Sequence, residues 1–204
     1  SCIIKLSFGR GLVMRFLKDI IIERGQIFPN NVVKVDCFLN HQVDVVIVSE
    51  LAKEIYNRFK DSGVTKILTV ESSGIPLACL TALEFKIPFV FAKKRRTINL
   101  TENLYKANVL SHTTGKYSEI MIAAEYITPE DKVLIVDDFL AKGSALHALI
   151  DIVNEAGAKL IGAAVAIEKG FQGGGDALRK EGVRVESLAI IDKMSQDKMI
   201  FRDE

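Results

Sequence analysis

Short apolar runs, each followed by a polar turn and a helical pattern, constrain the fold of this chain. The run KILTV ends at residue 70 and is followed by ESSG and the helical pattern IPLACLTALEF. The run VLIV ends at residue 136 and is followed by two aspartates, a short turn and the helical pattern SALHALIDIV. Strands that are apolar at every position are typical of sheets covered on both faces. Their alternation with helices predicts an α/β fold with a mostly parallel central sheet flanked by helices.

The remaining elements fit the same alternation. Asp44 is a helix N-cap candidate, Pro76 suits the first turn of a helix, and glycine follows two of the helical patterns. The segment GFQGGGDA is either a mobile loop over a ligand or a flexible connection. Cys79 is expected in the core. We predict helices over 14–24, 45–60, 75–85 and 143–157, strands over 64–70, 87–92, 132–138, 159–169 and 183–191, and a loop with a helix over 172–182.

Length and composition indicate one domain. The chain has 204 residues, of which 49% are hydrophobic, enough for one sizeable core. Residues 1–13 differ in character from the rest of the chain, and we predict that they are a non-native or disordered extension before a domain over 14–204. The alternative is that they form a genuine strand or arm. Residues 26–44 and the C-terminal strand are predicted to form a small hood.

The segment that begins KKRR at residue 93 has little apolar periodicity. The following stretches YKANVLSH and KYSEIMIAAEYI alternate as strands do and flank TTG, so they are predicted to pair as an antiparallel hairpin. We therefore expect a flexible, basic β-flap over about 93–120.

Charge and cysteine usage exclude several classes of protein. The formal net charge is +1, so no strong field favours nucleic acid or an anionic membrane, and neither partner is expected. The three cysteines form no CxxC pair, which argues against a metal knuckle or a disulfide framework, and no metal ligands are predicted. No uninterrupted apolar run approaches 18 residues. A reduced, cytoplasmic protein is the expectation.

The turn after the two aspartates has the features of a phosphate site. Ligands of parallel sheets bind beyond the carboxyl ends of the strands, and a helix N-terminus offers backbone N–H groups and a positive dipole end. Neither GxxxxGK[ST] nor GxGxxG is present, so a Walker loop and a dinucleotide fingerprint are both excluded. The residues of this predicted cradle are Ala141, Lys142, Gly143, Ser144 and Ala145.

Asp137 and Asp138 precede this cradle directly. Two carboxylates repel a phosphorylated ligand unless they bind hydroxyl groups of that ligand or a metal ion. A phosphorylated sugar satisfies both demands, because its vicinal hydroxyls donate to the carboxylates while its phosphate lies on the helix N-terminus. A strand-end acid pair with no ligand remains the alternative on these residues alone.

The stretch VLIVDDFLAKGSA resembles the phosphoribosyl pyrophosphate (PRPP) motif of the type I phosphoribosyltransferases. The segments KVDCFLNHQVD, ESSGIPLA, the flap, DDFLAKGSA and AIEKGFQGG, in this order, are similar to those of the bacterial enzymes of this family that use xanthine. The resemblance runs from about Met14 to the end of the chain. It implies a type I phosphoribosyltransferase fold and a purine-salvage reaction in which xanthine and PRPP give xanthosine 5′-monophosphate and pyrophosphate.

The resemblance also implies a role for each matching residue. Asp137 and Asp138 face the ribose as the catalytic acids, and the cradle 141–145 holds the 5-phosphate. The loop of Glu71, Ser72, Ser73 and Gly74 receives pyrophosphate through its backbone amides and a strained peptide, with Lys93 and Lys94 of the flap nearby. Val33, Asn40 and Lys169 contact xanthine, where Val33 replaces a commoner leucine.

The chemistry of these residues adds two expectations. The Lys169 ammonium only donates, so it suits a 6-oxo group and opposes the amino group of adenine, while Asn40 is suited to reading position 2. Hypoxanthine-guanine enzymes of the superfamily usually carry an aspartate where this chain has Ala141. Because alanine cannot accept a proton, we predict that xanthine, a relatively acidic purine, arrives already ionised.

The resemblance further implies Mg²⁺ bound mainly through PRPP and a homodimer. Three alternatives remain open on the sequence. The chain could use guanine or hypoxanthine, sense PRPP as a transcriptional regulator, or bind a sugar phosphate without catalysis. The roughly thirty residues before the hood leave little room for a DNA-binding module, which argues against a regulator.

Overall fold

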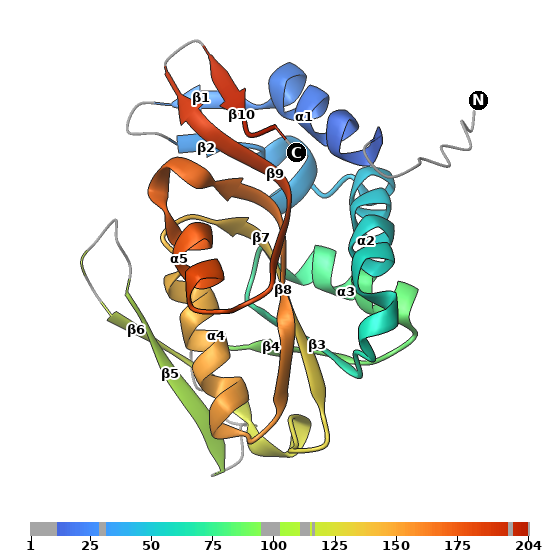
Figure 1. Ribbon diagram of the computed structural model, residues 1–204, viewed down its shortest axis with the longest axis vertical. Helices are drawn as coiled ribbons and strands as arrows, with labels where there is room; N and C mark the ends of the chain where they lie inside the picture. The colour runs from blue at the N-terminus through green and yellow to red at the C-terminus, as the bar shows by residue number, and fades with distance from the viewer. Residues whose placement is uncertain are drawn as a thin grey trace.

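The central sheet has six strands in the order β10-β9-β8-β7-β3-β4 (Figure 1). The computed structural model describes residues 12–28, 32–94, 103–110, 115, 117–195 and 198–203. All neighbouring strands are parallel except β10, which is antiparallel to β9, so the predicted mostly parallel sheet is confirmed. The strands are β3 (Lys66–Val70), β4 (Phe89–Ala92), β7 (Lys132–Leu140), β8 (Lys159–Lys169), β9 (Val185–Met194) and β10 (Met199–Phe201).

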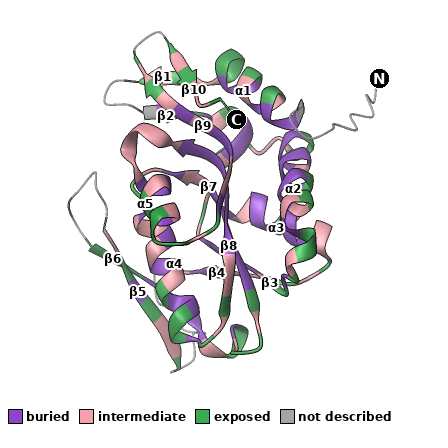
Figure 2. Ribbon diagram, in the orientation of Figure 1, coloured by how far each residue is buried: buried purple, intermediate pink, exposed green. Residues whose placement is uncertain are grey.

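Helices cover both faces of this sheet (Figure 1). Along β7, Leu134 and Val136 belong to one buried cluster, which also contains residues of α1, α2 and α3. Val133 and Ile135 belong to a second cluster with residues of α4 and α5. The central strands are therefore buried on both sides (Figure 2), which explains their continuous apolar runs. The helices are α1 (Leu12–Arg24), α2 (Val45–Phe59), α3 (Ile75–Phe85), α4 (Ser144–Glu155) and α5 (Gly174–Lys180).

Local sequence signals fix the starts of two helices. The Asp44 carboxylate accepts hydrogen bonds from the backbone N–H groups of Val46 and Ile47 at 3.2 and 3.3 Å, so the predicted N-cap of α2 is confirmed. Pro76 lies in the first turn of α3, as predicted. The prediction that Cys79 is in the core is wrong, because α3 turns this side chain to the surface while other positions face the sheet.

The segments predicted as the hood lie together at one end of the molecule (Figure 1). Strand β1 (Gln26–Phe28) pairs antiparallel with β2 (Val32–Lys34), and a π-helical turn, η1 (Asp36–Asn40), comes next. Strands β9 and β10 and helix α1 reach the same end. Helix α1 begins two residues before Met14, and Val13 is 3% exposed, so residue 13 packs in the core. The predicted extension otherwise lies outside the described residues.

The predicted hairpin is present as β5 (Leu104–Leu110) and β6 (Tyr117–Ala123), which pair antiparallel. Its apolar side is not free, because Ala107, Ile120 and Ile122 are buried in the same cluster as α4. The hairpin thus forms an outer layer over α4 (Figure 1). Thr113 and Thr114 of the TTG turn, and most of the basic segment, residues 95–102, lie outside the described residues. Within the described ranges, no helix is long and apolar enough to cross a membrane.

Candidate active site

Asp137 and Asp138 lie near the carboxyl end of β7, which continues two residues further than predicted, to Leu140. The two residues are 5% and 4% exposed. The Asp137 Oδ1 atom accepts a hydrogen bond from the backbone N–H of Asp138 at 2.9 Å. Successive residues of a strand point to opposite faces of the sheet. The two carboxylates therefore contact different neighbours although they are adjacent in the sequence.

Asp138 is held by two other segments. Its Oδ1 atom accepts a hydrogen bond from Ser73 Oγ at 3.0 Å, and its Oδ2 atom accepts one from Asn40 Nδ2 at 3.3 Å. Ser73 belongs to the ESSG loop and Asn40 ends η1 in the hood. The acid pair, the loop and the hood therefore meet at Asp138.

The ESSG loop approaches Asp137 closely because it contains Gly74. A Cβ atom at residue 74 would lie 2.5 Å from Asp137 Oδ1 and 2.3 Å from Thr69 Oγ1, closer than any side chain tolerates. The loop is also joined to the end of β4: the Glu71 N–H donates to the Ala92 carbonyl at 3.0 Å. The peptide bond between Glu71 and Ser72 is cis.

The two flap lysines differ in their surroundings. The Lys94 N–H donates to Glu71 Oε1 at 2.6 Å, and the charge of Lys94 acts on Asp137. Lys93 pairs through its backbone with Met121 of β6, and its Nζ lies 6.0 Å from the Phe91 ring centroid. Lys94 is thus joined to the ESSG loop, whereas Lys93 lies along the groove between β4 and β6.

The predicted phosphate cradle forms the turn between β7 and α4. Gly143 has φ +86°, a left-handed conformation that favours glycine, and α4 begins at the next residue. The first N–H groups of an α-helix point out of its N-terminus, here towards the turn, and no side chain of Gly143 caps them, as an anion site requires.

The segment GFQGGGDA forms a 3-10 turn, Gly170–Gln172, and the start of α5, so it is not an unstructured connection. The Gly174 N–H donates to the Ala141 carbonyl at 3.2 Å, and a Cβ atom at Gly174 would lie 2.4 Å from that oxygen. The start of α5 therefore packs directly against the cradle. The glycines permit this contact, which explains why the segment is glycine-rich.

The residues predicted to contact the base lie beside the acid pair or in the hood. Asn40 donates to Asp138, and its Oδ1 atom is buried without a hydrogen-bond partner among the described residues. Lys169 ends β8, with its Nζ 5.6 Å from the centroid of the Phe139 ring. Val33 is 6% exposed within the core, so its side chain is occupied by packing and its backbone is what remains for a ligand.

Phe139 was not predicted as a site residue. It follows Asp138 directly, is half-buried, and lies beneath the Lys169 ammonium. Aromatic rings offer stacking surfaces to bases. The residue was visible in the motif DDF, but the apolar periodicity of a strand end does not distinguish a phenylalanine that packs only in the core from one that also lies beside a charged side chain.

Burial and mutual repulsion dominate the electrostatics of the site. Burial raises the pKa of Asp137 well above its ordinary value, and the adjacent Asp138 raises it further. The hydrogen bond from the Asp138 N–H and the charge of Lys94 oppose this rise. Burial also lowers the pKa of Lys169. The site therefore holds carboxylates that gain from hydroxyl donors, next to an ammonium that gains from an acceptor.

Comparison with known proteins agrees with this geometry. The model of the phosphoribosyl transferase domain matches residues 35–175. A curated xanthine phosphoribosyltransferase of Clostridium novyi is 48% identical over 190 residues, covering 93% of this chain and 100% of the relative. One of Alkaliphilus metalliredigens is 47% identical, covering 94% of this chain and 95% of the relative.

The fold is also that of solved structures. The adenine phosphoribosyltransferase of Giardia lamblia superposes with a TM-score of 0.70 at 22% identity, covering 87% of this chain and 96% of that one. The enzyme of Leishmania tarentolae superposes with a TM-score of 0.72 at 18% identity, covering 89% and 90%. Together with the acid pair, the cradle and the ESSG loop at one sheet edge, these matches establish that the chain belongs to the type I phosphoribosyltransferase family.

Proposed function

We propose that the protein is a xanthine phosphoribosyltransferase of purine salvage, a pentosyltransferase that converts xanthine and PRPP to xanthosine 5′-monophosphate and pyrophosphate. The observation that carries the proposal is the position of the Lys169 ammonium over Phe139, one residue from the acid pair. A donor-only group at that point selects a purine with an oxo group. The names of relatives at 44–48% identity over most of the chain support the same substrate.

PRPP is proposed to lie along the edge of the sheet. Its 5-phosphate accepts hydrogen bonds from the backbone of the cradle 141–145, at the N-terminus of α4. Its ribose hydroxyls donate to Asp137 and Asp138. Its pyrophosphate lies on the ESSG loop, where Lys94 supplies positive charge, and Lys93 is the second candidate. Each group of PRPP then meets a partner of complementary charge or hydrogen-bonding capacity.

Xanthine is proposed to lie against Phe139. Lys169 donates to the 6-oxo group, and the unpartnered Oδ1 atom of Asn40 is a ready acceptor for a ring N–H. Asn40 would leave Asp138 when a ribose hydroxyl takes that carboxylate, which frees its amide for the 2-oxo group. Val33 contributes through its backbone.

The reaction is displacement at C1 of the ribose. The C1–O bond to pyrophosphate breaks with oxocarbenium character, and a purine nitrogen donates the electron pair for the new bond. Residue 141 is alanine, and its carbonyl is engaged with α5, so no carboxylate stands there to take the purine proton. The protein orients two substrates and stabilises charge, and the proton is lost before binding.

We expect Mg²⁺ to enter with PRPP. Both oxygens of Asp138 and one of Asp137 already accept hydrogen bonds, and the described part of the chain gathers no set of three ionisable metal ligands. Mg²⁺ keeps several waters and binds through substrate phosphates at such sites. The ion would neutralise the leaving pyrophosphate.

We also propose a cytoplasmic homodimer. Apolar side chains remain exposed on α2 and α3, among them Val45 at 64%, Val46 at 65% and Leu83 at 67%. A second copy packed against α2 and α3 would remove these side chains from water. Sedimentation should give twice the 22.6 kDa chain mass, and Val46→Asp should shift the protein towards the monomer. A wild-type monomer at micromolar concentration would disprove the dimer.

The substrate is tested by measuring pyrophosphate release from PRPP with xanthine, guanine, hypoxanthine and adenine in parallel. We expect the highest kcat/KM with xanthine and none measurable with adenine. Lys169→Ala should lower kcat/KM for xanthine up to about hundredfold, because a hydrogen bond to a charged group contributes about 1.5–3 kcal/mol and each 1.4 kcal/mol is tenfold. Preference for guanine or hypoxanthine would favour the alternative enzyme, and salt-dependent DNA binding without turnover would favour a PRPP-sensing regulator.

The source of proton removal is tested by the pH dependence of kcat/KM for xanthine. The acidic limb should follow the ionisation of the base, so it should move to lower pH with a more acidic xanthine analogue. The alkaline limb should reflect Lys169, whose pKa is lowered from 10.5 by burial, and Lys169→Arg should move it to higher pH. An acidic limb that stays fixed with every analogue would indicate that an enzyme group, and not the base, controls it.

Asp137→Asn is expected to stabilise the ligand-free protein while abolishing turnover. The pKa of Asp137 is higher in the folded than in the unfolded protein, so stability falls as pH rises through the folded value. At neutral pH the substitution should raise Tm by about 2–4 °C, which corresponds to about 1 kcal/mol in a chain of this size. The gain should disappear below about pH 4, where both states are protonated. The exposed Asp151→Asn is the control, and a lower Tm for Asp137→Asn at neutral pH would contradict the assignment.

A further inference from the structure

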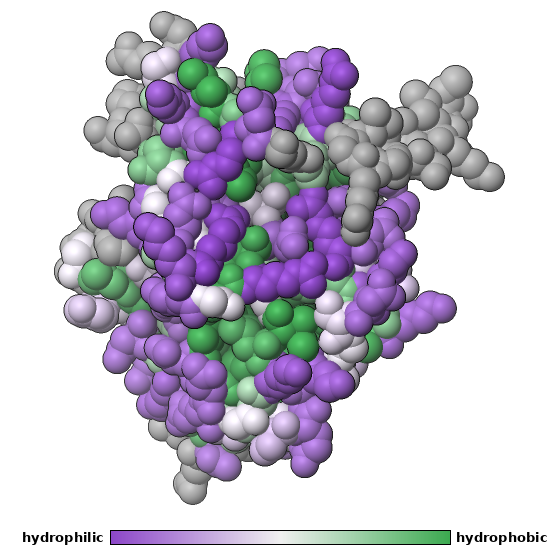
Figure 3. All heavy atoms as spheres, viewed as in Figure 1, coloured by the Kyte–Doolittle hydropathy of each residue, from purple (hydrophilic) through white to green (hydrophobic). Residues whose placement is uncertain are grey.

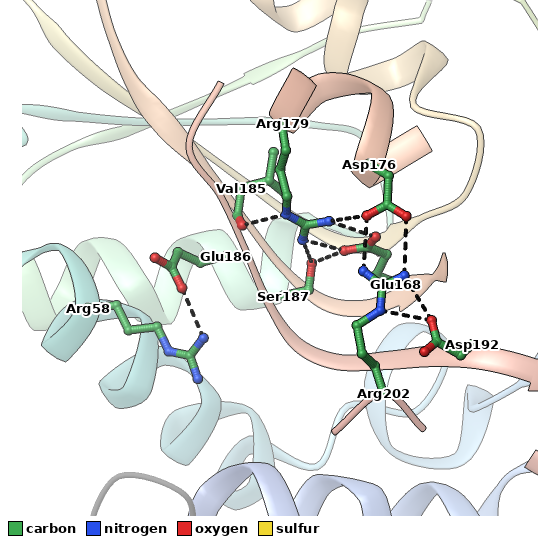
Figure 4. A network of polar contacts seen from close by, with 9 residues as sticks. All are labelled: Arg58, Glu168, Asp176, Arg179, Val185, Glu186, Ser187, Asp192 and Arg202. Carbon is green, nitrogen blue, oxygen red and sulfur yellow. Dashed lines mark hydrogen bonds and ion pairs between the residues drawn. The ribbon is translucent and has the colours of Figure 1, made fainter. Parts of the chain in front are cut away.

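Five charged side chains of alternating sign link α5 to the last two strands (Figure 4). Neither the proposed contacts with PRPP nor those with xanthine use them. Two of them lie in α5, one in β8 directly before Lys169, one in β9 and one directly after β10. We call them the charged chain; in order of contact they are Glu168, Arg179, Asp176, Arg202 and Asp192.

The inner end of the charged chain is buried. The Glu168 carboxylate is 0% exposed and accepts hydrogen bonds from Arg179 Nη1 at 3.0 Å and Nη2 at 2.7 Å. Ser187 Oγ donates to the same carboxylate, and Arg179 Nε donates to the Val185 carbonyl at 3.2 Å. A Cβ atom at Gly175 would lie 2.1 Å from Glu168 Oε1, so α5 touches the carboxylate through a glycine. The position of α5 is therefore fixed by the residue before Lys169.

The outer end of the charged chain is half-exposed. Arg202 donates to Asp176 through Nη1 at 3.0 Å and Nη2 at 3.2 Å, and to Asp192 through Nε at 2.9 Å. A Cβ atom at Gly170 would lie 2.9 Å from Asp192 Oδ1 and 3.2 Å from Arg202 Nη2. The residue after Lys169 is thus packed against this second pair. The surface over this region is strongly hydrophilic (Figure 3).

The charged chain consequently contacts both sequence neighbours of Lys169, the residue before it and the residue after it. Its buried end holds Glu168 and its outer end packs against Gly170. It also reaches the phosphate cradle, because α5 begins with the Gly174 N–H bound to the Ala141 carbonyl. Asp176 joins the two ends, since it accepts hydrogen bonds from both Arg179 and Arg202.

We propose that the charged chain is the positioning device for Lys169, and that it fixes this ammonium relative to the cradle that holds the 5-phosphate. The proposal rests on the proposed function, in which Lys169 recognises the base. A buried ion pair adds little net stability over apolar packing, so Glu168 and Arg179 are better explained by the geometry that they impose. The two arginines bridge acids through planar forks, which fixes direction as well as charge.

A similar group of ion pairs around Glu186 of β9 provides a control, because it allows an effect on the position of Lys169 to be distinguished from a general loss of stability. Glu186 also holds two arginines, Arg58 at 3.1 Å and Arg184 at 3.1 Å, and it is adjacent to Ser187 but belongs to a separate group of contacts (Figure 4). Glu186 and Asp176 are 29% and 44% exposed, so replacing either one leaves the buried pair intact. Glu186→Gln is therefore the control for Asp176→Asn.

The test is steady-state kinetics with xanthine and PRPP varied separately, for wild type, Asp176→Asn, Arg202→Gln and Glu186→Gln. We expect the first two variants to raise the KM for xanthine about tenfold, since a small displacement of a positioned group is costly. Their KM for PRPP should stay within about twofold, and Arg202→Lys should recover only part of the loss because lysine cannot bridge both acids. Glu186→Gln should leave both constants unchanged even if its Tm falls equally.

A measurement independent of activity accompanies the kinetics. The Gly173 N–H donates to the Gly170 carbonyl at 3.0 Å, so its hydrogen exchange reports on the turn after Lys169. Exchange should quicken in Asp176→Asn and not in Glu186→Gln. An unchanged xanthine KM in Asp176→Asn, or an equal rise in Glu186→Gln, would overturn the positioning role. A wild type that makes no nucleotide from xanthine would instead refute the proposed function, and the exchange data would still decide whether the charged chain holds the turn.

Discussion

Two adjacent carboxylates buried at the end of β7 are the constraint around which the site is built. Asp137 and Asp138 repel each other in a place that water barely reaches, so each needs donors from elsewhere in the chain. Ser73 and Asn40 supply them to Asp138, and Gly74 lets the ESSG loop come close enough to do so. The loop and the hood are thereby brought to one point of the sheet edge. In the proposed complex, ribose hydroxyls would replace these donors, which would then become available to the ligand.

We infer that this arrangement lowers the stability of the ligand-free protein and raises its affinity for a ligand that donates hydrogen bonds. Without a ligand, the folded protein carries a carboxyl whose pKa is raised by burial and repulsion, and the charge is unfavourable at neutral pH. In the proposed complex, hydroxyl donors and the cation carried by PRPP would remove that penalty. The energy released would appear as affinity for PRPP, and only for a ribose oriented with both hydroxyls towards the acid pair. Such a site would select its sugar phosphate by geometry and by charge together.

The sequence predicted those parts of the structure that depend on local pattern. Strand β8 matches its predicted bounds, and β7 is two residues longer, because continuous apolar runs mark buried parallel strands. The acid pair, the cradle and the ESSG loop could be located because each follows such a strand. Contacts over long sequence distances could not be predicted: nothing in the sequence placed Phe139 beside Lys169, and the glycine-rich segment gave no sign that Gly174 binds Ala141. The ion pairs from Glu168 to Arg202 have no periodicity that would reveal them.

Ala141 bears both on the chemistry of the site, through its side chain, and on the position of α5, through its carbonyl. Its methyl side chain cannot accept a proton, which is why we propose a reaction with a base that is already ionised. Its carbonyl accepts the Gly174 N–H, so the same residue anchors α5 and, through Arg179, the strand end that carries Lys169. An ionised base gives the protein less proton chemistry to perform and makes correct placement the larger part of catalysis. A purine selected by its oxo groups needs a rigid ammonium more than it needs a catalytic base, and the ion pairs around Lys169 supply that rigidity at a distance from the reacting atoms.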